Sequence, residues 1–474
     1  MKYTKKFFSL SIVFLLMFSL LAVSASANSA QTQWDGTDST GAIVDDENCP
    51  IVVEHENLTF DIQEFPESYY REPESYLAYS GRVTAEYTFH NPADYTVNVT
   101  LMFPFGAIPD YGHIWDNETE ENLRYADTEK YDITVDGTPI DKKLRHTLTF
   151  WGRQFELAED LALLHDGFME DAFYSPDMPV TRYTYLPSGV DKETYNAADA
   201  AFVLSADSAK TRVYVEGQGG GQTLEDGVRI TAWVDLQKGP VVNVIGEPLE
   251  QMPEWKFYEN GACEKEIDGT MTLVNTETTT LREFALQEYD EASGILDYDW
   301  YNAFVSALNY FEWEYGAIHS TEIGFDISDR LMRWYEYELT LEPGQRIVNT
   351  VTAPIYPSIN SNWEPPIYEY TYLLSPAQTW AEFGTLDIVV NTPFYMIESG
   401  AALDIEKTDS GYAAHLDGLP EGELTFTLCS EQMTKIPANL GNAYPEILLI
   451  GAIILFVAVA AVVILIRRKK RRNK

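Results

Sequence analysis

Two neighbouring segments of the chain alternate between apolar and polar residues, with Met102 as the one exception. Residues 83–89 carry an apolar side chain at every odd position, and so do residues 97–103. A period of two is that of a β-strand with one buried face. The intervening residues 91–94 read Asn-Pro-Ala-Asp, which is a turn composition. The pattern predicts an antiparallel hairpin whose odd-numbered residues share one buried face.

The same alternation predicts many further short strands. They cover residues 131–135, 144–150, 181–185, 212–215, 228–234, 241–245, 270–274, 335–341, 346–352, 368–373, 385–390, 411–416 and 424–428. Between two of them, Glu342-Pro343-Gly344-Gln345 places proline and glycine where a type II turn needs them. Short strands separated by turns favour β-sandwiches or barrels over a parallel α/β fold.

Two segments have a helical period instead. In residues 153–166 leucines recur at helical spacing, and Gly167 is the expected stop. In residues 297–315 one face is predicted to carry the apolar side chains Trp300, Phe304, Leu308, Phe311 and Tyr315.

We therefore expect a mainly β protein of two sandwich-like lobes with two inserted helices. A shift of pattern and two prolines place the boundary between lobes 51–250 and 251–436. Residues 28–50 are rich in Ser, Thr, Gly and Asp and are expected to be a flexible acidic lead-in.

Each end of the chain carries an apolar run. The first, residues 7–23, follows three lysines and precedes Ala25-Ser26-Ala27, the pattern of a secretory signal peptide over residues 1–27. An uncleaved anchor is the rival interpretation of this run. The second, residues 447–466, spans roughly 30 Å as a helix, about the thickness of the bilayer core.

The basic cluster at residues 467–474 indicates the cytoplasmic side of a membrane. We therefore expect a single-pass type I protein: an extracellular body, a stalk at 437–446, a transmembrane helix at 447–466 and a short tail. The segment Leu419-Pro420-Glu421-Gly422 lacks the Thr-Gly of a sortase signal and is expected to be a turn. These features are typical of a Gram-positive bacterial surface protein.

The charge excludes one class of partner. The chain has 32 basic and 74 acidic residues. Ten of the basic residues lie in the two terminal clusters, so the remaining 22 leave the body with a net charge of −52. Nucleic-acid binding needs basic side chains that displace counterions from phosphates, so we expect none.

Cysteine usage is sparse. Cys49, Cys263 and Cys429 allow at most one disulfide within the chain, and Cys263–Cys429 is the favoured pair because both lie in the second half. Without clustered histidines they do not form a zinc framework.

The common catalytic motifs are missing from the sequence. It contains no His-Glu-x-x-His, no Gly-x-Ser-x-Gly, no Walker loop and no EF-hand spacing. We therefore predict no catalytic, cofactor-binding or metal-binding residues, and no cofactor.

Paired carboxylates are the remaining chemistry to weigh. Four acidic residues flank Trp300 and Trp313, namely Asp297, Asp299, Glu312 and Glu314. A glycosidase needs two such groups across a sugar. A structural interpretation is simpler: the two aspartates would cap the helix and complement its dipole, and the two glutamates would face solvent.

Surface aromatics are a second candidate, since flat rings stack on sugar faces. One stretch contains Trp363, Tyr368, Tyr370, Tyr372 and Trp380. In a strand the three tyrosines would share a face, and core packing is the favoured interpretation of that face.

Several motifs resemble those of uncharacterised secreted bacterial β-proteins. A strand ending Tyr-Thr-Phe-His-Asn-Pro (87–92) and one ending Leu-Met-Phe-Pro-Phe-Gly (101–106) resemble their hairpin, which is similar to one in the vault and inter-alpha-trypsin inhibitor domain. The Pro-Gly turn at 341–345 and the Trp-containing segment 375–386 also resemble that group. The resemblance implies an all-β extracellular body and no assigned activity.

The sequence thus predicts a membrane-anchored surface protein that acts as a non-enzymatic binding or structural module of the bacterial envelope. Its partners would be the lipid bilayer, through residues 447–466, and another envelope protein or a glycan. The alternative is a cell-surface glycoside-active enzyme that uses paired carboxylates.

Overall fold

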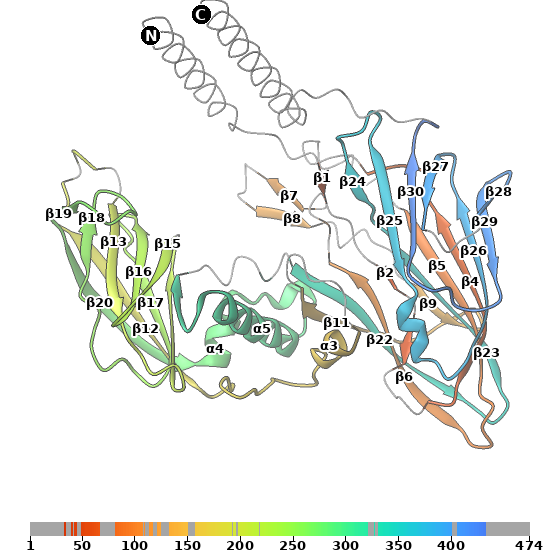
Figure 1. Cartoon of the computed structure of the whole chain (residues 1–474). Coiled ribbons are helices and arrows are strands. Elements are labelled where there is room, and N and C mark those ends of the chain that lie inside the picture. Colours follow the sequence, from red (N-terminus) through yellow and green to blue (C-terminus); the bar gives the residue numbers. More distant parts are fainter. Residues whose placement is uncertain are drawn as a thin grey trace, which may run out of the picture.

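The computed structural model describes most of the body of the chain (Figure 1). The described residues are 33–34, 39–40, 42–44, 49–66, 81–107, 109, 113–116, 121–124, 132–149, 157–191, 193–195, 198–217, 219–320, 327, 330–400 and 405–432. Both apolar runs of the termini lie outside these residues. Within them, no helix is both long enough and apolar enough to cross a bilayer.

The protein is mainly β, as predicted, and its strands form two lobes with helices between them (Figure 1). The terminal lobe is built from both ends of the body, with strands β1–β11 and β22–β30. The middle lobe contains strands β12–β21. The helices α3 (Leu157–Ala162), α4 (Leu281–Ala285) and α5 (Asp297–Tyr315) lie between the lobes.

The terminal lobe is a sandwich with one large sheet on one side and two smaller sheets on the other. The eight-stranded sheet has the order β10 (Thr138–Pro139), β9 (Asp132–Val135), β23 (Arg346–Pro354), β5 (Arg82–His90), β4 (Val52–Asp61), β26 (Phe383–Asn391), β29 (Gly411–Leu416), β28 (Glu406–Lys407). The four-stranded sheet has the order β11 (Lys143–Leu148), β22 (Leu331–Leu341), β6 (Val97–Gly106), β3 (Ile43–Val44).

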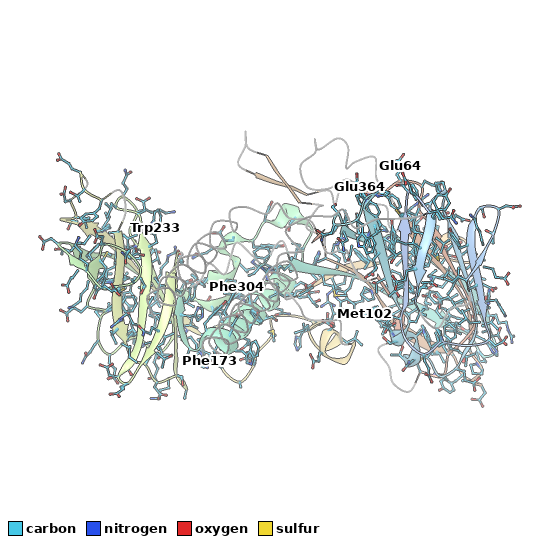
Figure 2. The ribbon with its side chains drawn as sticks, turned by 45° about the horizontal axis from the view of Figure 1, so that its top comes forward. Glu64, Met102, Phe173, Trp233, Phe304 and Glu364 are labelled. Carbon is cyan, nitrogen blue, oxygen red and sulfur yellow. The ribbon has the colours of Figure 1, made fainter. Side chains whose placement is uncertain are left out.

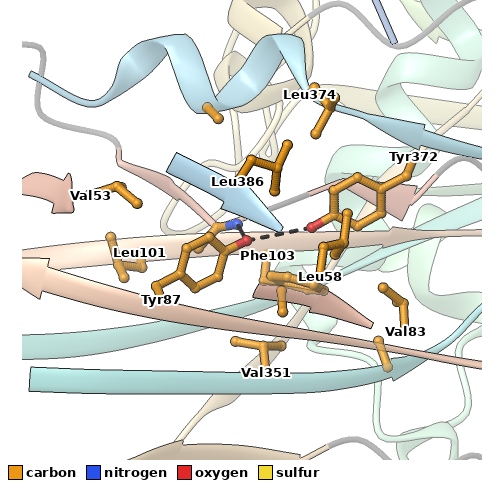
Figure 3. Packing of buried hydrophobic residues seen from close by; sticks show 14 of the residues in the cluster. Val53, Leu58, Val83, Tyr87, Leu101, Phe103, Val351, Tyr372, Leu374 and Leu386 are labelled. Atoms are coloured by element: carbon orange, nitrogen blue, oxygen red, sulfur yellow. Dashed lines mark hydrogen bonds between the residues drawn. The ribbon is translucent and has the colours of Figure 1, made fainter. Parts of the chain in front are cut away.

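The six-stranded sheet has the order β1 (Gln33–Trp34), β24 (Ser358–Asn360), β25 (Ile367–Leu373), β30 (Leu424–Cys429), β27 (Tyr395–Ser399), with β2 (Ser39–Thr40) beside β25. A separate hairpin joins β7 (His113–Asp116) and β8 (Glu121–Arg124). The short 3-10 helix η6 (Ser375–Thr379) precedes β26. Apolar residues from all three sheets of the sandwich form one continuous core (Figure 3).

The middle lobe is a sandwich of two five-stranded sheets. The inner sheet has the order β20 (Thr270–Thr280), β12 (Pro179–Ser188), β17 (Val241–Gly246), β14 (Thr211–Glu216), β21 (Ile318–Ser320). The outer sheet has the order β15 (Gly219–Leu224), β16 (Gly227–Val234), β13 (Ala198–Leu204), β18 (Lys256–Tyr258), β19 (Glu266–Ile267). One face of the inner sheet packs on the outer sheet, and the other packs on α4, α5 and the 3-10 helix η3 (Leu286–Glu288). A second 3-10 helix, η4 (Glu291–Ser293), precedes α5.

The predicted hairpin of residues 83–103 is wrong in its pairing and right in its buried face. Strand β5 pairs with β4 and β23, whereas β6 pairs with β22 and β3. The odd-numbered residues of both strands are nevertheless buried in the same core. The chain therefore crosses from one sheet to the facing sheet between β5 and β6, and the two strands meet through their side chains instead of their backbones.

A second crossing lies beside the first. The turn between β22 and β23 has Gly344 at φ 72°, and the Gln345 N–H donates to the Glu342 carbonyl at 2.9 Å, as a type II turn requires. The buried Asn91 binds this turn, because its carbonyl accepts from the Gly344 N–H at 2.9 Å and its side chain donates to the Leu341 carbonyl at 3.0 Å. The Asn-Pro and Pro-Gly motifs thus meet at one end of the sandwich.

The strand pairing divides the chain differently from the expected boundary at residues 250 and 251. Strand β12 pairs along its length with β20, across that boundary. Strand β5 pairs with β23, although they lie about 260 positions apart. The middle lobe is instead an insertion into the terminal lobe. Local sequence patterns cannot reveal such an insertion, because only pairing distant in sequence defines it.

The lead-in also differs from expectation where it is described. Strand β1 pairs with β24, β2 with β25 and β3 with β6. Ala42 and Ile43 are fully buried. These strands are too short to show a sequence period, and their conformation is fixed by pairing with strands of the sheets that they join.

The helices agree in part with the sequence. Helix α5 has the predicted bounds. Of the other predicted helix, residues 153–156 lie outside the described residues, and the described part is helical over α3 and ends at Ala162 instead of residue 166. Helix α5 also buries residues all round its first half instead of along one stripe, which is typical of a helix enclosed by other elements.

Candidate functional site

Helix α5 connects the two lobes. Its side chains share one apolar cluster with Tyr214 and Ile245 of the inner sheet and with Leu148 and Leu331 of the terminal lobe. Phe304 lies near the middle of this region (Figure 2). The burial of α5 against both lobes holds it in a fixed position, so groups on the helix are presented rigidly.

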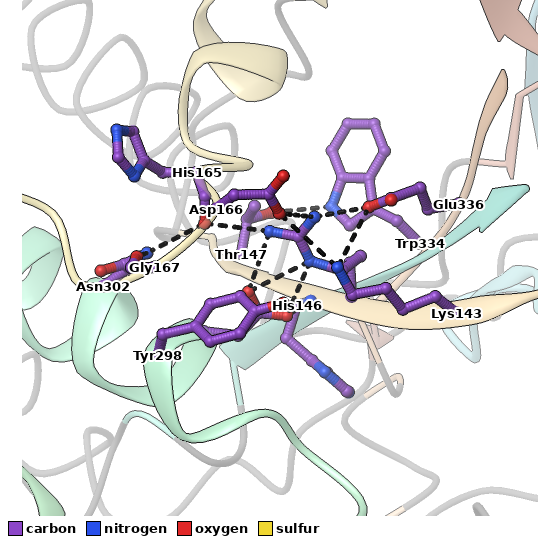
Figure 4. A network of polar contacts seen from close by, with 12 residues as sticks. Lys143, His146, Thr147, His165, Asp166, Gly167, Tyr298, Asn302, Trp334 and Glu336 are labelled. Atoms are coloured by element: carbon purple, nitrogen blue, oxygen red, sulfur yellow. Dashed lines mark hydrogen bonds and ion pairs between the residues drawn. The ribbon is translucent and has the colours of Figure 1, made fainter. Parts of the chain in front are cut away.

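A buried ion-pair network fastens the start of α5 to the terminal lobe (Figure 4). Arg145 of β11 contacts the Asp299 carboxylate from Nε and Nη2, each at 3.2 Å. Nη1 of Arg145 contacts Glu336 of β22 at 2.5 Å, and Nη2 donates to the His165 carbonyl at 3.0 Å. Both charged side chains of the Arg145–Asp299 pair are only 2% exposed. One arginine therefore joins β11, β22, α5 and the loop after α3.

Burial and pairing compete in this network. Burial by itself would lower the pKa of Arg145, but hydrogen bonds and charge from Asp299 and Glu336 raise it overall. Burial raises the pKa of Asp299, although the hydrogen bonds from Arg145 oppose that rise. Removing Arg145 would leave Asp299 buried without its guanidinium partner, whereas removing Asp299 would leave Arg145 still paired with Glu336.

The carboxylates that sequence reasoning considered for catalysis have separate roles. Asp299 does not cap the helix, because it accepts from Arg145 and from the His146 N–H at 2.9 Å. Asp297 is exposed, and the N-cap of α5 is Leu296, which makes no side-chain cap. Glu312 contacts Arg212 of β14 instead of facing solvent. The predicted capping by Asp299 and the solvent-facing Glu312 are therefore wrong. Neither aspartate is the N-cap residue, but Asp297 accepts from the Tyr298 N–H at 2.8 Å, and both aspartates lie in the first turn, where their charge complements the helix dipole as predicted.

The last two turns of α5 carry a partly exposed aromatic patch. We define the aromatic patch as Tyr310, Phe311, Trp313 and Tyr315. Trp313 is 81% exposed and Tyr315 is 55% exposed. The rings of Tyr310 and Trp313 are 6.0 Å apart, and those of Phe311 and Tyr315 are 6.1 Å apart and nearly parallel. Exposed clusters of large aromatic side chains are typical of binding surfaces.

Glu314 lies among the hydroxyl groups of this patch. It hydrogen-bonds to Tyr310, and this bond raises the pKa of Tyr310. Burial and then a hydrogen bond to Glu314 raise the pKa of Tyr315. The patch therefore offers flat apolar faces beside polar groups that can donate and accept hydrogen bonds.

A buried histidine lies beneath the patch. The His319 ring of β21 lies 6.2 Å from Phe311 and 6.4 Å from Tyr315, and it stacks on Tyr214. Burial lowers the pKa of His319 to about 4, so the ring is neutral at physiological pH. Among the described residues, none makes a hydrogen bond with its Nδ1.

The aromatic stretch singled out in the sequence belongs mainly to the core. Tyr370 and Tyr372 are fully buried, and Trp380 donates from Nε1 to the Ala42 carbonyl at 3.1 Å. Tyr368 is half-buried and stacks on Phe65 at 3.8 Å. The favoured core interpretation of the tyrosine face is confirmed. The patch on α5 was missed as a unit, because its rings were assigned to a buried face or weighed only as neighbours of carboxylates.

The predicted disulfide is wrong. Cys263 lies in the middle lobe and Cys429 in the terminal lobe, and both are free thiols. In the part of the chain that the structure describes, no group of three or more His, Cys, Asp or Glu side chains is arranged to hold a metal ion.

Comparison with known proteins gives little. No family model matches the chain, and neither does any curated protein. The resemblance to uncharacterised β-proteins therefore stays a prediction. A crystal structure of a putative nutrient binding protein from Legionella pneumophila aligns over 84% of this chain and 72% of that chain, at 9% identity and a TM-score of 0.31. A TM-score this low carries no argument about fold or function.

Proposed function

We propose that this protein is a membrane-anchored extracellular module of the bacterial envelope that binds a ligand through the aromatic patch and catalyses no reaction. The apolar runs and the terminal basic clusters support the anchoring and the orientation. The body is mainly β with a helix fixed between two lobes, which supports a scaffold that presents a surface.

The observation that carries the binding proposal is the exposure of Trp313 and Tyr315 at the end of a helix whose first half is buried. A single exposed aromatic side chain is common, whereas several exposed together are typical of an interaction site. The helix ends at Gly316, directly after the patch, so the rings are displayed at the rim of the helical layer.

A glycan is the ligand class that we infer for this patch. Rings 6.0 Å apart at an angle of 39° present faces on which sugar rings can stack, and Glu314 with its tyrosine partners can bind sugar hydroxyls. An uncharged glycan also avoids repulsion by the acidic body.

A matched pair of variants tests the patch. We expect W313A to weaken binding to purified cell-wall polysaccharide at least tenfold in a sedimentation or calorimetric assay. The control is W233A, which removes a tryptophan that is 56% exposed on β16 in the middle lobe (Figure 2). Equal binding by W313A and the unmodified protein, or an equal loss in W233A, would overturn the assignment.

The anchor is tested separately. The full chain should fractionate with membranes, and a version ending at Asn442 should be released into the medium. Protease added to intact cells should degrade the body of the full chain. Finding both forms in the medium, or a body that resists protease on intact cells but not on lysed cells, would contradict the proposed location.

A further inference from the structure

The N-terminal part of the body lies between the two smaller sheets of the terminal lobe. We define the N-terminal strap as the described residues 39–40 and 42–44. Its first strand, β2, runs parallel to β25 of the six-stranded sheet, and its second, β3, runs antiparallel to β6 of the four-stranded sheet. The strap therefore joins two sheets that face the same side of the eight-stranded sheet.

Side chains from the core bind both backbone groups of Ala42. The Ala42 N–H donates to the Tyr87 hydroxyl at 3.1 Å, and the Ala42 carbonyl accepts from Trp380 at 3.1 Å. The Tyr87 and Tyr372 hydroxyls lie 3.5 Å apart (Figure 3). The attachment of the strap thus depends on the polar groups directly beneath it.

A buried carboxyl group completes this cluster. Glu56 of β4 is 1% exposed, and the hydroxyls of Tyr87 and Tyr372 hydrogen-bond to it. No described residue makes a hydrogen bond with its Oε1 atom. Burial raises the pKa of Glu56 to about 7, more than the tyrosine hydrogen bonds lower it.

The described groups that influence the pKa of Glu56 are the hydroxyls of Tyr87 on β5 and Tyr372 on β25. Tyr337 of β22 in turn helps to raise the pKa of Tyr372. No Lys, Arg or His of the described residues contributes to the shift at Glu56. The neighbouring His55 bonds Thr385 at 2.8 Å, and alternation places its side chain on the opposite face of the sheet.

We propose that Glu56 is a proton-sensitive lock for the N-terminal strap, closed when the carboxyl is neutral and weakened when it ionises. A carboxylate formed at this buried position is paired with no Lys, Arg or His among the described residues, so its ionisation costs free energy. Lifting the strap would break the hydrogen bond from the Ala42 N–H to the Tyr87 hydroxyl and open this cluster to solvent. The inference is independent of the ligand proposed for the aromatic patch.

Hydrogen exchange of the full-length protein tests the lock. Peptides covering residues 39–44 are followed by mass spectrometry from pH 5 to pH 8, after correction for the intrinsic pH dependence of exchange. If opening returns Glu56 to its ordinary pKa of 4.5, opening becomes up to about 70-fold more favourable at pH 8 than at pH 5. Strand β17 of the middle lobe serves as an internal control and should not follow this change.

Two variants make the result decisive. E56Q keeps the shape of the side chain without its charge and should abolish the pH dependence of the strap. Y87F removes the acceptor for the Ala42 N–H and should raise exchange of the strap already at pH 5, even if E56Q does not fold. A strap that exchanges equally at all pH values in the unmodified protein, or one whose pH dependence survives in E56Q, would overturn the proposal.

Discussion

The terminal lobe buries two acidic side chains in opposite ways. Asp299 of α5 packs against it and is paired with Arg145, with carboxylate and guanidinium in contact at two positions. Glu56 lies in its core, where tyrosine hydroxyls and no Lys, Arg or His of the described residues influence its pKa. The pair joins elements that must stay together, whereas the lone carboxyl lies under a short strap. Two equally buried acidic side chains can therefore differ in role. One that is paired with a cation holds structural elements together, whereas one without a cationic partner has a raised pKa and can titrate.

The largest effect should follow from breaking the paired site. R145M leaves Asp299 buried without its counter-charge, and we expect the free energy of unfolding to fall by about 3–5 kcal/mol. Chemical denaturation followed by tryptophan fluorescence measures the change. The double variant R145M/D299N should recover part of the loss, and strictly additive effects would contradict direct coupling between the two side chains.

The unpaired carboxyl of Glu56 should make the free energy of unfolding depend on pH. The folded protein binds a proton at Glu56 more tightly than the unfolded chain does, so its contribution is complete below pH 4.5 and is lost as pH rises to about 7. Relative to E56Q, the unmodified protein should lose about 3 kcal/mol of unfolding free energy across this window.

The control for Glu56 is E54Q. Glu54 is partly exposed, and its hydrogen bonds with Arg346 lower its pKa. Its contribution therefore has the opposite sign and should be smaller. Parallel pH profiles for E56Q and the unmodified protein would show that Glu56 does not carry the effect.

His319 should contribute a pH dependence of stability that is opposite in sign to that of Glu56 over nearly the same pH range. Its pKa falls from 6.5 to about 4 in the folded protein, so its contribution is complete above pH 6.5 and is lost as pH falls toward 4. H319F should remove about 2–3 kcal/mol of this dependence. Between pH 4 and pH 7, the slope of the unfolding midpoint against pH should therefore change in opposite directions in H319F and E56Q, relative to the unmodified protein. A change of the same sign in both variants would show that one assignment is wrong.

The smallest effect on stability is expected at the aromatic patch. Because Trp313 is 81% exposed, W313A should change the free energy of unfolding by no more than about 0.5 kcal/mol. The same denaturation experiment measures it. A loss of unfolding free energy comparable to that of R145M would mean that Trp313 has a packing role. The patch would then no longer be supported as a binding surface.

Sequence reasoning recovered many strands because their side-chain alternation is local. Each predicted strand lies on an observed one, and α5 has its predicted bounds. Strand β4 was missed although it lies in the middle of the eight-stranded sheet. A bulge between Val53 and His55 shifts its alternation by one residue, and the buried Glu56 breaks the apolar pattern.

The candidate sites were harder to predict. The exposure of Trp313 depends on how far the lobes cover α5, and the sequence pattern assigns Phe311 and Tyr315 to the same face as the buried Trp300. The partner of Asp299 lies 154 positions away, and the hydroxyl groups around Glu56 come from two other strands. Nothing close in the sequence marks these partners.

The sequence by itself determined which side chains of β5 and β6 face the core, because the two-residue period is a property of each strand alone. It also set the overall class of the protein and the type II turn at Pro343 and Gly344. Only the tertiary structure decided that β5 and β6 lie in facing sheets, that the middle lobe is an insertion, and which buried acid has a cation. Backbone pairing and charge pairing join residues far apart in the chain, so they are settled when the sheets assemble.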